Sequence, residues 1–232
     1  MLAAATVVVL AAIAELVFER EGASRNVAKP KGATDTELDG RPVVWVVADG
    51  ADMSEAYVGM CVESVRAAAK DKHQVVVVNN GTFASLIPGW KVDLSAVPEP
   101  TRTQARTLAS WKLLYYYGGV VVPASTVFVG SVDDLVARAR GCFAVERPRG
   151  GAHARVLGAD REHPALRDMV RRMELNIARG APGEDAFDGV TEGIVSDTIV
   201  AHGGALLDGE VAGLRDARGE PVSADSLFGG VA

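Results

Sequence analysis

The stretch that decides the fold is LLYYYGGVVVPASTV, residues 113–127. Apolar and aromatic residues run up to Gly118 and Gly119, which predicts that a helix ends there, because glycine readily adopts the positive φ common just after helices. The three valines at 120–122 predict a buried strand. Pro123 has no backbone N–H for a sheet, so we expect the strand to bend, bulge or end there.

The segments before this stretch predict a βαβ unit with a right-handed crossover. PVVWVVADG (42–50) and HQVVVVNNG (73–81) are continuous apolar runs closed by turn residues, a pattern typical of strands buried on both faces. Between them lies a predicted helix, 54–71, with Ser54 as its cap and with helical spacing of Tyr57, Met60, Cys61, Ser64, Val65 and Ala68. A second helix, TRTQARTLASWKLLYYY (101–117), leads into the opening stretch.

The segments after it alternate in the same way and predict an α/β domain. A short helix capped by Ser131 is followed by the strand candidate GCFAVERP (141–148) and by an amphipathic helix at 163–180. A further short helix, 189–204, precedes a tail with weak strand signals from Ala205 onward. The core face of the 163–180 helix is predicted to comprise Leu166, Met169, Val170, Met173 and Ile177.

Composition narrows the functional classes. The 232-residue chain is 48% hydrophobic, enough for a sizeable core, and its net charge is −6. A general nucleic-acid binder needs a basic surface, so no nucleic-acid partner is expected. The two cysteines, Cys61 and Cys142, have no metal-ligand spacing and are predicted to be buried thiols.

The first residues form an apolar run, Leu2–Phe18, with the single charge Glu15. As a helix it would be about 25 Å long, against about 30 Å for a bilayer core. We favour a membrane or partner-helix anchor using residues such as Leu10, Ile13 and Val17. A helix packed on its own domain and an unremoved targeting sequence remain alternatives, although the basic segment of a signal peptide is missing.

The chain therefore divides into an anchor helix (1–20), a polar, glycine-containing linker (21–41) and an α/β domain (42–232). An apolar anchor of this kind predicts a membrane-associated protein of an organelle or of the endomembrane system. The expected partners are the bilayer, other protein subunits, or both, contacted through the anchor.

The order of these segments resembles that of GT-A glycosyltransferases, in particular the DXD-containing sugar transferases related to mannosyltransferases and capsular polysaccharide synthesis proteins. The matching features are a proline-led strand with a tryptophan (RPVVWVV, 41–47), Cys61 and Ser64 in a Cys-x-x-Ser pattern, Tyr117–Gly118–Gly119, and His163–Pro164 at the start of a later helix. The resemblance covers roughly residues 41–203. It implies a GT-A-like, Rossmann-like mixed sheet flanked by helices.

The chemistry that the resemblance implies is not matched. Where the family has an Asp-x-x-Arg pattern that holds the nucleotide sugar, this chain has Thr107 and Ser110. Where the family has the Asp-x-Asp that binds Mn²⁺ or Mg²⁺, it has Pro123, Ala124 and Ser125, which lack carboxylates. Both motifs are therefore degenerate, and we expect no metal, no cofactor and no catalytic residue.

Two functional hypotheses follow. The first is a non-catalytic glycosyltransferase-like domain that acts as an accessory or scaffold subunit of a membrane-associated assembly. The alternative is a membrane-anchored glycosyltransferase that uses a nucleotide sugar without the usual metal motif. In that case we expect nucleotide-sugar contacts from Asp49, Asp52, Arg106, Gly118 and Gly119. Asp49 and Asp52 follow the first strand, where open α/β sheets bind ligands, although a solvated turn is the favoured interpretation of both.

One structural feature distinguishes the two hypotheses. The alternative requires cationic side chains, such as Arg102, Arg106 or Lys112, to meet in a pocket at the end of the strand 43–47. The accessory hypothesis does not require such a pocket.

Overall fold

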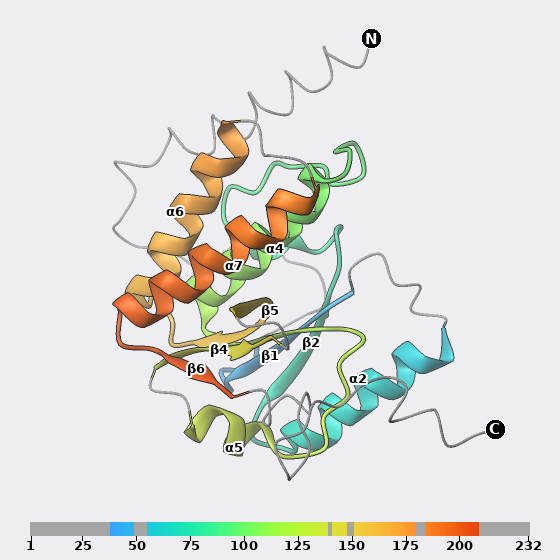
Figure 1. The fold of residues 1–232 in the computed structure, drawn as a ribbon. Coiled ribbons are helices and arrows are strands. Elements are labelled where there is room, and N and C mark those ends of the chain that lie inside the picture. The colour runs from blue at the N-terminus through green and yellow to red at the C-terminus, as the bar shows by residue number, and fades with distance from the viewer. Residues whose placement is uncertain (1–37, 49–54, 139–140, 148–150, 180–183, 209–232) are drawn as a thin grey trace, which may run out of the picture.

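The computed structural model describes residues 38–48, 55–138, 141–147, 151–179 and 184–208, which form a mixed sheet with helices on both faces (Figure 1). The α/β class predicted from the sequence is confirmed. In chain order the elements are β1 (Val43–Val47), α2 (Ala56–Ala69), β2 (Gln74–Val78), α3 (Phe83–Leu86), α4 (Thr101–Tyr117), β3 (Gly119–Pro123), α5 (Val132–Ala137), β4 (Cys142–Glu146), β5 (Ala152–Ala159), α6 (Pro164–Ala178), α7 (Glu184–Ala201) and β6 (Ala205–Leu207).

The strand order is β2-β1-β3-β5-β4-β6. Strand β1 pairs in parallel with β2 and β3, which confirms the predicted βαβ unit, whereas β5 is antiparallel to both of its neighbours. Strand β2 was predicted to be buried on both faces, but it is an edge strand with three partly buried residues. Strand β5, which joins the two halves of the sheet, was not predicted.

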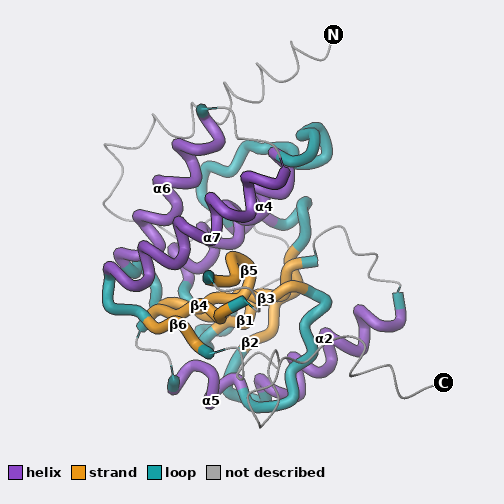
Figure 2. Tube along the Cα trace, in the orientation of Figure 1, coloured by secondary structure: helices purple, strands orange, loops and turns teal. Residues whose placement is uncertain are grey.

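The sheet lies between two layers of helices, with α4, α6 and α7 on one face and α2 and α5 on the other (Figure 2). In β1, Val43, Trp45 and Val47 pack in the core on the α4 side, and Val44 and Val46 pack on the α2 side. All five residues are therefore buried, as the continuous apolar run predicted.

The two crossover helices place a topological switch point between β1 and β3. Helix α2 connects β1 to β2 on one face of the sheet, and α4 connects β2 to β3 on the other. The chain thus adds strands on opposite sides of β1. In open α/β sheets, ligands bind beyond the carboxyl ends of the strands at such a point.

The glycine pair of the opening stretch fixes the contact between α4, β1 and β3. Gly118 and Gly119 have φ values of +71° and +101°. The indole Nε1–H of Trp45 donates a hydrogen bond to the Gly118 carbonyl at 3.0 Å. A Cβ atom on Gly119 would lie 2.0 Å from the Val43 carbonyl oxygen. Only glycine therefore allows β3 to begin directly against β1.

The predicted anchor helix lies outside the part of the chain that the structure describes. Residues 1–20, with Leu10, Ile13 and Val17, and the linker up to residue 37 lie outside the described residues. Within the described part of the chain, none of the helices is both long enough and apolar enough to cross a membrane.

Helix α6 shows the predicted facing, because Leu166, Met169, Met173 and Ile177 are all buried. The helix begins after His163, whose Nδ1 accepts a hydrogen bond from the backbone N–H of Ala165 at 3.2 Å. A protonated imidazole has no free lone pair on Nδ1, so this cap requires the neutral ring. Burial lowers the pKa of His163 below its ordinary value of 6.5, with Asp160 opposing and His202 reinforcing the shift.

We expect the stability of the domain to fall as the pH is lowered below about 6.5, in part through His163. Because the folded-state pKa is lower than the unfolded one, its contribution is full above the unfolded pKa and is lost as the pH falls through the folded pKa. His163→Ser retains a capping oxygen but does not titrate there. Urea unfolding at about pH 7.5 and about pH 5.5 should show a smaller loss for the variant than for the parent. Equal losses would contradict a role for this cap.

Candidate functional site

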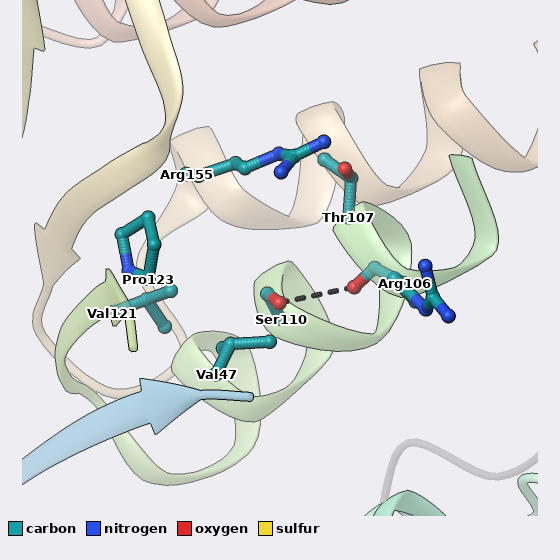
Figure 3. A pocket seen from close by; sticks show the side chains of 7 residues that line it. All are labelled: Val47, Arg106, Thr107, Ser110, Val121, Pro123 and Arg155. Carbon is teal, nitrogen blue, oxygen red and sulfur yellow. Dashed lines mark hydrogen bonds between the residues drawn. The ribbon is translucent and has the colours of Figure 1, made fainter. Parts of the chain in front are cut away.

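A hollow lies at the switch point, beyond the ends of β1 and β3. It is small, with a volume of about 20 Å³ for the centres of water-sized molecules. Residues from four elements line it, namely Val47 (β1), Val121 and Pro123 (β3), Arg106, Thr107 and Ser110 (α4), and Arg155 (β5) (Figure 3). Both its place in the topology and its polar wall make it the candidate binding site.

The apolar floor of the hollow exists because the ladder between β1 and β3 ends there. Val47 and Pro123 are opposite each other in the parallel register. Pro123 has no N–H to donate, and the last bond runs from the Ala124 N–H to the Val47 carbonyl at 2.9 Å. The chain then leaves the sheet in a turn. The prediction that the strand bends, bulges or ends at Pro123 is confirmed.

Helix α4 provides the hydroxyl groups of the wall. Thr107 and Ser110 are each only 5% exposed. Their hydroxyls donate to backbone carbonyls one turn earlier, Thr107 to Thr103 at 3.1 Å and Ser110 to Arg106 at 3.0 Å. Both hydroxyl groups thus have hydrogen-bond partners within the helix. This explains how two polar side chains are accommodated where they are almost fully buried.

Two arginines approach the hollow from different elements. Arg155 is exposed and extends from β5 over the hollow toward Thr107, as Figure 3 shows. The side chain of Arg106 is only 12% exposed. It lines the hollow, and its Nε–H donates to Asn80 Oδ1 at 3.0 Å, on the loop after β2. Figure 3 shows the guanidinium of Arg106 directed away from Pro123 and Val121, whereas that of Arg155 lies over the hollow.

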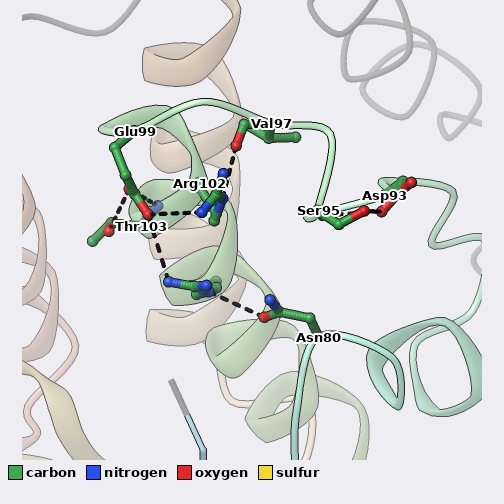
Figure 4. Close-up of polar contacts among 8 residues, drawn as sticks. Asn80, Asp93, Ser95, Val97, Glu99, Arg102 and Thr103 are labelled. Atoms are coloured by element: carbon green, nitrogen blue, oxygen red, sulfur yellow. Dashed lines mark hydrogen bonds and ion pairs between the residues drawn. The ribbon is translucent and has the colours of Figure 1, made fainter. Parts of the chain in front are cut away.

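Glu99 organises the beginning of α4 through contacts with Thr103 and Arg102 (Figure 4). Its carboxylate accepts from the Thr103 N–H at 3.1 Å and from the Thr103 hydroxyl at 2.8 Å. Its Oε1 lies 3.7 Å from a guanidinium nitrogen of each of Arg102 and Arg106. A carboxylate at a helix N-terminus is favourable, so this network orients α4 and Arg106 together.

The other two cations proposed from the sequence do not reach the hollow. Arg102 donates from Nε to the Val97 carbonyl at 2.7 Å. Lys112 has a side chain that is 3% exposed, and its Nζ contacts Glu174 Oε1 at 2.6 Å and lies 6.0 Å from the centre of the Trp90 ring. Of the three candidates, Arg106 alone lines the hollow.

The remaining predicted site residues are dispersed. Gly118 and Gly119 lie at the start of β3, at the end opposite the hollow. Ser125 is exposed in the turn after β3 and does not line the hollow. Asp49 and Asp52 lie outside the described residues. Among the described residues, no cluster of three or more His, Cys, Asp or Glu side chains is arranged for a metal ion.

Arg155 was missed because β5 was missed. The segment Ala152–Ala159 has neither a long apolar run nor a clean alternation of buried and exposed residues. A weak indication of a strand is present near the C-terminal end of this segment, where Val156 and Leu157 precede Gly158. That glycine packs so closely on Phe143 of β4 that a Cβ atom would lie 2.2 Å from the ring.

No family model matches this chain, and no curated protein sequence matches it. Among solved structures, the PaToxG glycosyltransferase is similar over 69% of this chain and 69% of its own, with 11% sequence identity and a TM-score of 0.46. Similarity of this extent identifies neither a family nor an activity for this chain.

Proposed function

We propose that this chain carries a GT-A-like domain that has lost metal-dependent sugar transfer and serves as an accessory subunit of a larger membrane-associated assembly. The observation that carries the proposal is the convergence of three degenerate motif positions. Thr107, Ser110 and Pro123 were identified from two separate sequence motifs, and all three line one hollow at the switch point. This is the arrangement expected if the hollow is a former nucleotide-sugar site.

The described lining of this hollow is poorly suited to the metal-dependent reaction. Transfer from a nucleotide diphosphate sugar builds up negative charge on the leaving phosphates, and a carboxylate-bound metal commonly offsets it. Hydroxyl, proline and valine side chains occupy the described wall and floor, together with two arginines. None of these side chains is a good ligand for Mn²⁺ or Mg²⁺.

A second candidate is a glycosyltransferase that works without a metal. The specific observation in its favour is that Arg106 and Arg155 line the hollow. Guanidinium groups form strong paired hydrogen bonds with phosphate oxygens and could offset the same developing charge. The two candidates therefore agree on the site and differ on whether turnover occurs there.

The accessory role rests on the apolar run Leu2–Phe18, which needs a lipid or protein surface to cover it. Deleting residues 1–18 should release the chain from the membrane fraction or from co-purifying subunits. Full retention of the truncated chain in the same fraction would count against the assembly part of the proposal.

We expect the 232-residue chain to release no nucleoside diphosphate above background from common nucleotide sugars, with or without Mn²⁺. Coupled detection of the released diphosphate is the measurement. Turnover that requires Mn²⁺ would contradict the proposal. Turnover that persists in a chelator and disappears in Arg155→Gln would instead establish the second candidate. Arg167→Gln is the matched control, because Arg167 is exposed on α6 and does not line the hollow.

A further inference from the structure

We infer that the outer face of α6 docks an acidic helix of a partner subunit, whose carboxylates pair with a row of arginines. This outer face is exposed and comprises Arg167, Arg171, Arg172, Leu175 and Arg179. The inference deepens the proposed function, because it rests on the accessory role and names the chemistry of the subunit that this role requires.

Helix α6 lies at the outer edge of its helix layer, where it packs against α4 and α7 (Figure 1). Its inner face is apolar, and Met169 and Met173 are fully buried there. Leu175 comes two residues after Met173, which is about 200° further round a helix, so it lies opposite the buried face. The side of α6 that carries Leu175 and the arginines is therefore the side that a partner can reach.

The outer face concentrates positive charge on an acidic chain, whose net charge is −6. The arginines that follow Asp168 have no ion-pair partner among the described residues, and Arg167 has only a loose contact, 3.9 Å from Asp168 Oδ1. Both carboxylates of α6 have other contacts: Asp168 Oδ2 lies 2.8 Å from His202 Nε2, and Glu174 Oε1 lies 2.6 Å from Lys112 Nζ. The domain therefore leaves most of this positive charge unpaired, and such a surface favours an anionic partner.

The spacing of the outer face matches a helix better than an irregular acidic segment. Arg171, Leu175 and Arg179 follow one another at intervals of four residues, which places them about 6 Å apart along the axis. Carboxylates at the same interval on a facing helix would lie opposite the guanidinium groups, which pair with carboxylates through two parallel hydrogen bonds. Leu175 is 38% exposed and gives the row an apolar centre.

The residue types also favour a protein partner over a lipid surface. Every cation on the outer face is arginine, which is enriched at protein interfaces, whereas lysine is depleted there. Helices that bind bilayers insert large apolar side chains below the headgroups. The large apolar side chains of α6 are instead buried in the core of the domain, and the outer face has Leu175 alone to insert.

The test is a titration of the 232-residue chain with a synthetic helical peptide of about 20 residues that carries glutamates at four-residue intervals beside a row of leucines. We expect saturable binding that weakens between about 50 mM and about 200 mM salt. Arg171→Glu and Leu175→Asp should each reduce the affinity at least about 10-fold, because each places a like charge against the peptide. Fluorescence anisotropy of the labelled peptide is the measurement.

Two controls separate docking from general charge attraction. Arg138→Glu makes the same change of net charge at the end of α5, on the opposite face of the sheet, and should bind the peptide like the parent (Figure 2). A peptide of the same composition with its glutamates distributed round the helix should bind at least about 10-fold more weakly. Arg171 and Arg138 are both exposed, so their replacement should leave thermal unfolding unchanged.

Each remaining outcome overturns the inference. Absence of saturable binding at about 1 mM peptide would show that the outer face has no useful affinity for an acidic helix. Equal binding of the two peptides, or an equal loss in Arg138→Glu, would mean charge attraction without a docking surface. Binding to vesicles with about 30% phosphatidylserine that depends on Arg171, without peptide binding, would assign the face to lipid. Sugar turnover would remove the accessory role but leave these results as they are, so the two failures are distinguishable.

Discussion

Replacing Gly119 by alanine is expected to reduce the free energy of unfolding by more than about 4 kcal/mol, a loss that only severe backbone or packing conflicts produce. A Cβ atom there would lie 2.0 Å from the carbonyl oxygen and 3.0 Å from the carbonyl carbon of Val43. The φ of +101° is also unfavourable for alanine. Because Val44 and Val120 are paired in the ladder, β1 and β3 cannot separate without losing their hydrogen bonds.

The loss should be visible as low soluble yield, or as a collapse of the urea midpoint in material that can be purified. Gly59→Ala is the matched control, since Gly59 lies inside α2 and a Cβ atom there meets nothing within 4 Å. This control should stabilise the domain by up to about 1 kcal/mol through helix propensity. A Gly119→Ala protein that unfolds like the parent would show that β1 and β3 are not paired in this register.

The opening stretch shows which features a sequence can predict. The end of α4 at Tyr117 and the end of β3 at Pro123 were both predicted. Each boundary depends on a local covalent property, the positive φ available to Gly118 and the missing N–H of Pro123. Such properties act wherever the segment lies in the fold.

Features that depend on distant partners were not predictable in the same way. The predicted face of α2 included Tyr57 and Met60, which are exposed, whereas Val58 and Val62 are buried. Both sets recur at helical spacing, so periodicity alone could not choose between them. The sequence of β2 predicts a strand buried on both faces. Its position at the edge of the sheet depends instead on which strands pair with β1.

The residues of the candidate site also differ in whether local sequence or distant partners place them. Thr107, Ser110 and Pro123 were identified as motif positions, and the fold brings them together around one hollow. Arg155 required knowledge of β5, which forms between β3 and β4 through long-range pairing. The orientation of Arg106 required Asn80 and Glu99, which belong to two other loops. Sequence reasoning therefore singled out four of the residues that line the hollow, Arg106, Thr107, Ser110 and Pro123, and missed Arg155.

Introducing a carboxylate at Met173 should have the second largest effect. Met173 is 0% exposed. It lies with Leu166, Met169 and Ile177 in the core between the sheet and the helices α4, α6 and α7. We expect Met173→Asp to lower the free energy of unfolding by about 3–5 kcal/mol, because it leaves a charge or an unpaired acid in an apolar interior and removes packing. Urea unfolding followed by circular dichroism is the measurement.

The matched control is Leu175→Asp, two residues further along α6. Leu175 is 38% exposed, so the same new carboxylate stays in contact with water and should cost less than about 1 kcal/mol. A clear difference between the two variants would confirm the facing of α6, which packs against α4, the helix that carries Arg106, Thr107 and Ser110. Equal effects of the two substitutions would mean that this facing is wrong and that α4 is not supported in the position the hollow requires.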